Sequence, residues 1–279
     1  MILVTGGTGF LGRELVKRLQ RDNDVLILTR RDLPNSVRGD VSDYNTVSKA
    51  IKDAEVVFHL AAESDQFAPY ERHYSTTVLG TSNVMKAAAK TGAKVVYMSS
   101  AVVMKKYQTN YVKAKIEAEK IAKKYWDDLE VPIIRTSLVY DKEVVNRLKR
   151  LSYLPFPHKR VKTHLAYRGS VVEALIGAMN YGKSEIYPVA DKEPVLLTQL
   201  IKEVARPRPV LWIPPQTIWL GIALFYPIEK VAEALNVRPP MTATYLRYLF
   251  EDSELDIEKS AKKLRYKPVD TLEMVRKLK

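Results

Sequence analysis

A set of glycines directly after the first apolar segment constrains this chain more than any other feature. Residues 2–5 have the composition of a short buried strand, and Gly6, Gly9 and Gly12 follow at G-x-x-G-x-x-G spacing, where a helical pattern begins. There Gly6 permits a tight turn, Gly9 lets the backbone approach a pyrophosphate, and Gly12 lets the helix pack close to the sheet. The free N–H groups at the helix start would receive the phosphates. The residues of this predicted dinucleotide-binding turn are Gly6, Thr8, Gly9, Phe10, Leu11 and Gly12.

Short β-branched segments alternate with longer helical patterns over the first two-thirds of the chain. The segments are apolar at consecutive positions, as expected for strands whose two faces are both covered by helices. With right-handed crossovers, this alternation predicts an α/β fold with a Rossmann-type, doubly wound parallel sheet. Strands are expected at residues 2–5, 25–28, 56–58, 95–98 and 131–134, and a helix at about 111–125.

The alternation ends near residue 142. A proline- and lysine-rich stretch around residues 153–157 is typical of a loop, and a helix at 171–179 and a strand at 185–189 then return to the sheet. From Pro194 onward the pattern is mostly helical and is broken by prolines. We therefore expect an NAD(P)-binding domain at 1–142, rejoined by about 169–190, and a small helical substrate lobe at 143–168 and 191–279.

Cofactor choice in such a fold is decided at the end of the second strand. Here the chain has Thr29-Arg30-Arg31, and two guanidinium groups suit the 2′-phosphate of NADP, which a carboxylate would repel. Asp32 follows and leaves NAD as the alternative. Asp40-Val41 stands where the end of a third strand could touch the adenine, although Asp40 could instead cap a helix.

A serine, a tyrosine and a lysine have the spacing of an acid–base site. Tyr111 and Lys115 are four residues apart on a predicted helix and therefore share one face. A nearby ammonium lowers the pKa of a phenol, which makes tyrosine a workable acid or base near neutral pH. Ser99 and Ser100 end the preceding strand at the carboxyl edge, where ligands bind, and Ser100 could hydrogen-bond the reacting oxygen.

Together, and in this order, these motifs resemble those of the extended or atypical short-chain dehydrogenase/reductases, the NAD(P)-dependent epimerase/dehydratase group. The resemblance covers roughly the first 140 residues. The matching segments are Thr5 to Gly12, Gly39-Asp40-Val41, His59-Leu60-Ala61-Ala62, Ser99-Ser100-Ala101-Val102, Tyr111 to Lys115 and Ile134-Arg135-Thr136-Ser137.

The resemblance implies that Tyr111 is the proton donor and acceptor, supported by Lys115 and Ser100. Beyond the glycine turn, the residues expected at the cofactor are Arg30, Arg31, Asp40, Val41, Leu60, Ala61, Ala62, Thr77, Ser99, Tyr111, Lys115, Arg135, Thr136, Ser137 and Leu138.

The chain also departs from the sugar-nucleotide epimerases of this group. Val103-Met104-Lys105 stands where they usually carry Val-Tyr-Gly, and Thr77 stands where they often have Asn. Thr136 and the residues after it replace the usual Arg-Pro or Arg-Tyr and the following Asn. Together these changes weaken the interpretation as an enzyme that acts on UDP-sugars.

The second lobe contains a conspicuous apolar stretch, residues 210–226, with Trp212 and Trp219. In a cleft beside the nicotinamide it would favour an apolar ketone or alcohol as substrate. The alternatives are that this stretch is the core of the lobe, a homodimer surface or a peripheral membrane contact, since Lys and Arg flank it.

Composition excludes several other classes of protein. With no cysteine there is no disulfide framework, iron–sulfur centre or thiolate nucleophile, and the four histidines have no metal-ligand spacing, so we expect no metal. The net charge of +13 comes from scattered lysines interleaved with acids, which is typical of solvated helix faces rather than a nucleic-acid site. Met1 runs straight into a strand, and the longest apolar run is half a membrane span. We expect a cytoplasmic protein.

These observations lead to three hypotheses. The first is an oxidoreductase that moves hydride between NADP(H) and a carbonyl or hydroxyl group of a small, apolar substrate. The second is a sugar-nucleotide epimerase or dehydratase. The third is a non-catalytic dinucleotide-binding subunit or redox sensor, because a fold alone does not fix a function.

Overall fold

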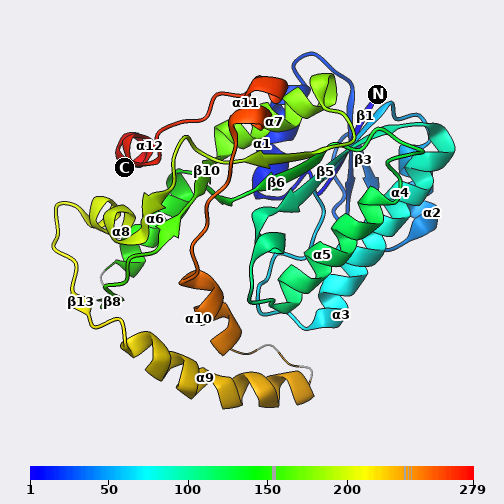
Figure 1. The fold of residues 1–279 in the computed structure, drawn as a ribbon. Coiled ribbons are helices and arrows are strands. Elements are labelled where there is room, and N and C mark those ends of the chain that lie inside the picture. The colour runs from blue at the N-terminus through cyan, green and yellow to red at the C-terminus, as the bar shows by residue number, and fades with distance from the viewer. Residues whose placement is uncertain (153–154, 236, 238, 240) are drawn as a thin grey trace.

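The centre of the molecule is a seven-stranded parallel sheet, seen in a computed structural model that describes residues 1–152, 155–235, 237, 239 and 241–279 (Figure 1). The strand order is β11-β6-β5-β4-β1-β2-β3, and every neighbouring pair is parallel. The predicted doubly wound α/β sheet is therefore confirmed. The strands are β1 (Ile2–Thr5), β2 (Val25–Thr29), β3 (Ser36–Arg38), β4 (Val56–His59), β5 (Lys94–Ser100), β6 (Ile133–Thr136) and β11 (Ile186–Val189).

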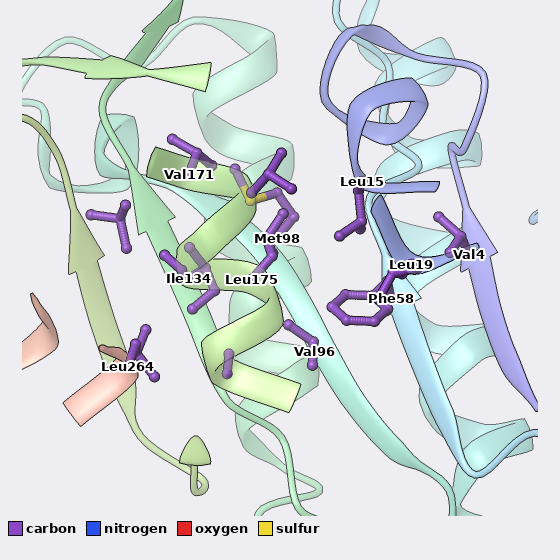
Figure 2. Close-up of a cluster of buried hydrophobic side chains, with 14 of the residues drawn as sticks. Val4, Leu15, Leu19, Phe58, Val96, Met98, Ile134, Val171, Leu175 and Leu264 are labelled. Carbon is purple, nitrogen blue, oxygen red and sulfur yellow. The ribbon is translucent and has the colours of Figure 1, made fainter. Parts of the chain in front are cut away.

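Helices cover both faces of this sheet. On one face α1 (Phe10–Leu19), α7 (Arg168–Tyr181) and α11 (Glu258–Leu264) pack against the strands through a core that includes Leu15, Leu175 and Leu264 (Figure 2). On the other face α2 (Tyr44–Ile51), α4 (Gly80–Thr91) and α5 (Asn110–Lys123) form a second core. Burial on both faces explains why the strand sequences are apolar at consecutive positions. α11, which we expected in the small lobe, instead lies on α7 beside the sheet.

The helix that begins with α3 (Tyr70–His73) continues into α4 through a π-helical turn, Tyr74–Leu79. We did not predict this turn from the sequence. A π-turn accommodates one more residue than an α-turn and is often found at functional sites.

The remaining elements form a smaller lobe. Its short pairs are β7 (Leu138–Tyr140) with β10 (Leu165–Tyr167), β9 (Lys162–Thr163) with β12 (Val195–Leu196), and β8 (Phe156–Pro157) with β13 (Trp212–Ile213). Its helices are α6 (Lys142–Leu151), α8 (Leu197–Ala205), α9 (Thr217–Ala234), α10 (Ala243–Leu249) and α12 (Thr271–Leu278).

The predicted loop at 153–157 needs a correction. Residues 153 and 154 lie outside the described part of the chain, but Phe156 and Pro157 pair with Trp212 and Ile213 as a short parallel ladder. A two-residue strand containing proline has no periodicity that a sequence could reveal. In the described residues, no helix is both long and apolar enough to cross a bilayer.

Candidate active site

The glycine turn joins β1 to α1 at the carboxyl edge of the sheet. Gly6 has φ 71°, and a Cβ there would lie 2.7 Å from the amide nitrogen of Ala61, so only glycine fits. A Cβ on Gly12 would overlap the carbonyl oxygen of Gly6. Gly9 is the N-cap of α1 and offers no side-chain cap, and the first helical turn carries no acidic residue. Uncapped N–H groups at a positive helix end fit the pyrophosphate of NAD(P).

A buried hydrogen-bond network fixes the carboxyl end of β4, next to the glycine turn. The Thr81 hydroxyl donates to the Thr77 carbonyl at 2.6 Å, so its oxygen accepts from Nε2 of His59 at 3.0 Å. His59 Nδ1 then accepts from the Thr5 hydroxyl at 2.8 Å, and Thr5 Oγ1 accepts from the Ala61 amide at 3.3 Å. Burial lowers the pKa of His59 to about 3, with a smaller contribution from Lys115. The network holds Leu60, Ala61 and Ala62 against the glycine turn with a neutral imidazole.

The predicted cofactor-selecting residues lie at the end of β2. Arg30 and Arg31 are exposed, and Nε of Arg30 is 3.9 Å from a carboxylate oxygen of Asp40. The Asp40 carboxylate accepts from the amide and hydroxyl of Ser42 in a tight turn. The alternative role of Asp40 as a helix cap is wrong, because α2 is capped by Asp43.

Ser100, Tyr111 and Lys115 come together where β5 ends and α5 begins. Thr109 caps α5 by accepting from the Val112 amide at 3.3 Å, so Tyr111 lies in the first turn. Burial raises the pKa of Tyr111, while a hydrogen bond with Ser100 lowers it and offsets part of that rise. The expectation that Lys115 lowers the pKa of Tyr111 is wrong for this state of the protein.

Lys115 itself is buried, and its ammonium group is hydrogen-bonded to the backbone of β5. Its Nζ donates to the Met98 carbonyl at 2.9 Å and lies 5.7 Å from the centre of the Tyr97 ring. Burial lowers the pKa of Lys115 to about 8, although the Glu119 carboxylate opposes this shift. Lys115 is therefore fixed against β5, one helical turn beyond Tyr111 on α5.

Glu119 continues the same helix face and is a site residue that we did not predict. Its carboxylate accepts from Ser99 Oγ at 2.7 Å, from Arg135 at 2.9 and 2.5 Å, and from Lys123 at 2.9 Å. Burial would raise the pKa of Glu119, but these hydrogen bonds outweigh burial and lower the pKa to about 2. The side chains of Ser99 and Arg135, which we expected at the cofactor, thus hold Glu119. The i, i+4 spacing from Lys115 was the signal that could have revealed it.

His73 is a second unpredicted neighbour. It ends α3 just before the π-helical turn, and its ring meets the Tyr111 ring edge-on with centroids 5.9 Å apart. The side chain is fully buried, and neither ring nitrogen has a hydrogen-bond partner within normal distance among the described residues. Burial lowers the pKa of His73.

The other predicted cofactor residues are distributed around this centre. Thr77 accepts from the Glu63 amide at 3.1 Å inside the π-turn. Thr136 pairs with Ser100 across β5 and β6, and its hydroxyl is buried without a partner among the described residues. Ser137 donates to the His164 carbonyl, and Leu138 is exposed. Val41 is buried in the core beside α2 and α4.

A cavity of about 390 Å³ opens beside the start of α5. Its walls combine the sheet domain, including Tyr70, Thr109 and Asn110, with the polar side of α9, including Glu229 and Lys230. The apolar stretch 210–226 does not line this cavity. Its Trp212 and Ile213 pair with β8, Ile218 and Ile222 are buried beside α10, and Leu211, Trp219, Leu220 and Leu224 are exposed. Of the alternatives for this stretch, a substrate cleft is not supported by this cavity.

Comparisons with known proteins agree with this geometry. The family model described as "NAD dependent epimerase/dehydratase family" matches residues 2–143. A 2-alkyl-3-oxoalkanoate reductase of Stenotrophomonas maltophilia is 29% identical over 52% of this chain, and the match spans only 45% of that relative. A UDP-glucose 4-epimerase of Vibrio cholerae is 26% identical over 98% of this chain and 92% of its own length.

The fold also matches solved structures. A short-chain dehydrogenase/reductase superfamily protein of Agrobacterium tumefaciens, solved with bound NAD, superposes with a TM-score of 0.76 at 17% identity, over 99% of this chain and 95% of that one. NAD(P) is the cofactor typical of the family. The chain belongs to the NAD dependent epimerase/dehydratase family.

Proposed function

We propose that this protein is an oxidoreductase that transfers hydride between NADP(H) and a carbonyl or hydroxyl group of a small substrate. The observation that carries the proposal is the placement of Ser100, at the end of β5 on the carboxyl edge of the sheet, beside Tyr111 in the first turn of α5, with Lys115 one turn further along that helix. When bound, the nicotinamide supplies or accepts the hydride. The chain's own residues must then manage the proton and orient the reacting oxygen.

In the reductive direction, the Tyr111 hydroxyl gives its proton to the substrate oxygen. The raised pKa of Tyr111 keeps this hydroxyl protonated at neutral pH, which suits a general acid. Ser100 is within reach of the same oxygen and orients it. Lys115 supplies a buried positive charge below the tyrosine, and Glu119 favours the protonated form of that lysine.

Two further observations bear on cofactor and substrate. Arg30 and Arg31 are exposed at the end of β2, which supports binding of a 2′-phosphate and hence NADP over NAD. The cavity beside the start of α5 is lined by Thr109 and Asn110, which precede Tyr111 in the chain, and carries Glu71, Lys113 and Glu229 among its walls, which supports a substrate with polar groups rather than a purely apolar one.

A sugar-nucleotide epimerase is the second candidate. The observation that favours it is the similarity to the UDP-glucose 4-epimerase of Vibrio cholerae, which runs through nearly the whole chain. An epimerase would leave the cofactor unchanged over a full cycle, whereas a reductase would consume NAD(P)H in proportion to product.

The test is a turnover screen with NADPH and NADH over ketones, sterol-like compounds and UDP-sugars. Tyr111→Phe should lower kcat by about 10²- to 10⁴-fold, the usual contribution of a positioned acid, and leave cofactor affinity nearly unchanged. Tyr125→Phe, just beyond the far end of α5, is the matched control. Full activity of Tyr111→Phe would refute the assigned role, and interconversion of UDP-sugars without net oxidation of NAD(P)H would establish the epimerase instead.

A further inference from the structure

The exposed large hydrophobic side chains are concentrated on α9 and its flanks. Along α9 and its C-terminal cap, one row of side chains points away from the rest of the protein. We call it the α9 stripe, and its residues are Leu220, Leu224, Ile228, Val231 and Leu235. From Leu220 onward they recur every three or four residues, which places them on one continuous face.

The opposite side of α9 already has a partner. Ile218 and Ile222 are buried against Ala243 and Phe250, on and beside α10. The stripe is therefore not the hidden side of a helix that forms the core of the lobe. In Figure 1, α9 lies at the outer edge of the molecule with α10 between it and the sheet domain. Soluble monomers rarely expose an apolar row of this extent without a partner.

The charges that precede the α9 stripe along the chain are positive. From residue 204 to residue 228 the chain contains two arginines and no acidic residue. Exposed cations lie on the segments that form or flank the short β8–β13 ladder leading into α9, and the buried Glu203 pairs with Arg206 at 3.5 Å. These cations are Lys159, Arg160, Lys202, Arg206 and Arg208. At the other end of the helix, Lys230 is paired with Glu233 at 2.8 Å.

We propose that α9 docks this protein onto the surface of a bilayer that contains anionic lipids. The α9 stripe would enter the boundary between headgroups and acyl chains, and the cations at its N-terminal end would lie among the headgroups. Trp219 and Tyr226 are both exposed on α9, and such aromatic side chains favour the membrane–water boundary. The helix is too short and too interrupted to cross the bilayer, so it lies in the surface plane.

This docking requires both the apolar row and the positive charge. Full-length protein is therefore mixed with vesicles of phosphatidylcholine alone and with vesicles that also contain phosphatidylglycerol, and the bound fraction is measured by flotation. We expect binding to the phosphatidylglycerol vesicles to be several-fold tighter than to phosphatidylcholine alone, and to weaken with added salt.

The decisive variant replaces three exposed stripe residues, Leu220→Gln, Leu224→Gln and Val231→Gln together. Their side chains are 71, 63 and 58% exposed, so the fold should be retained, which thermal unfolding checks. Removing three inserted aliphatic side chains should weaken vesicle binding roughly 100-fold. Tyr181→Gln, an exposed apolar residue at the end of α7, is the matched control and should bind as the natural sequence does.

Tryptophan fluorescence gives a second readout. Trp219 is strongly exposed, and only Trp126 and Trp212 accompany it. Adding phosphatidylglycerol vesicles should shift the emission to shorter wavelength, and Trp219→Phe should remove most of this shift while binding persists. The proposal is overturned by equal affinity for the two vesicles, by binding that survives the triple substitution, or by a homodimer in lipid-free solution that the triple substitution dissociates.

Discussion

The ammonium group of Lys115 donates to the backbone carbonyl of Met98, with Nζ and O 2.9 Å apart. Met98 lies on β5 immediately before Ser99 and Ser100, so this bond joins the middle of α5 to the strand that carries Ser100. Burial in this position lowers the pKa of Lys115 to about 8. The lysine therefore loses its proton within the pH range of an ordinary assay.

Activity should accordingly fall as the pH rises through about 8, where the buried ammonium becomes neutral. Glu119 raises the pKa of Lys115, so Glu119→Gln should move this fall to lower pH. The measurement is kcat/KM against pH, which reports ionisations of the free enzyme.

Glu117→Gln, on the same helix but exposed, is the control for that profile. Because Glu119→Gln leaves Arg135 without its carboxylate partner, the comparison is made well below the melting temperature of the variant. If kcat/KM fell at the same alkaline pH in the natural protein, in Glu119→Gln and in Glu117→Gln, the role of Glu119 would be contradicted.

Cofactor preference should depend on the exposed arginine at the end of β2. Arg30→Asp places a negative charge where we expect the 2′-phosphate, so affinity for NADPH should fall about 10- to 100-fold, the value of one charge-assisted contact. Affinity for NADH should change little. Fluorescence titration with each cofactor gives both constants, and Arg21→Asp, an exposed arginine between α1 and β2, controls for net charge. Equal losses for the two cofactors would overturn the assignment of NADP.

The same substitution should have opposite effects in two helices. Gly177 on α7 faces α11, and a Cβ there would overlap the backbone carbonyl of Leu264. Gly177→Ala should therefore destabilise the fold by about 1–3 kcal/mol or more, as overpacked sites do. Gly221 on α9 has only the end of the Leu246 side chain nearby, at 3.3 Å, so Gly221→Ala should stabilise by up to about 1 kcal/mol through helix propensity. Urea unfolding measures both, and an equal effect at the two positions would contradict the packing described for α7.

Acid should weaken the fold through its buried imidazoles. The pKa of His59 is about 3 in the folded protein, whereas its ordinary value is 6.5. Below pH 6.5 the unfolded chain therefore binds a proton at this histidine, and the folded protein does not. Stability should then fall as the pH drops below 6.5, by up to about 1.4 kcal/mol per pH unit from His59 alone. His73 and His164, whose pKa values are also lowered by burial, add to this loss.

Asp191 acts in the opposite direction, because burial raises its pKa to about 6 and protonation stabilises the folded state as the pH drops from about 6 toward 3.8. Because three histidines oppose one aspartate, we still expect the free energy of unfolding to decrease as the pH drops. Urea unfolding at several pH values tests this, with His59→Gln expected to flatten the dependence and His158→Gln, at an exposed position, expected to leave it unchanged. If stability still fell steeply at low pH in His59→Gln, that loss of stability would come from other groups.

Much of the sheet domain could be predicted from the sequence, because burial on both faces of a parallel strand requires consecutive apolar residues. The glycine turn was equally predictable, since steric requirements at Gly6 and Gly12 leave no other residue. The position of Tyr111 one turn from Lys115 follows from helix geometry alone. The spacing does not predict the direction of the Lys115 side chain, because the backbone carbonyl of Met98 on β5 sets it.

Other features of the site depend on tertiary contacts that leave no local pattern. His73 contacts Tyr111 and lies immediately before a π-turn, which changes the helix register, and residue periodicity does not reveal a single extra residue. The apolar run in α9 also left several roles open. A segment that is apolar all round does not indicate which face is covered, and here one face meets α10 while the other remains exposed.

The π-helical turn Tyr74–Leu79 has a consequence for which changes the site tolerates. One additional residue rotates everything upstream by about 100° about the helix axis relative to everything downstream. Deleting a single residue between Tyr74 and Leu79 would leave a regular helix with nearly the same composition and length. It would also move the imidazole of His73 off the ring of Tyr111, so a change in spacing alone would reshape the surroundings of that tyrosine while every chemical group remained present.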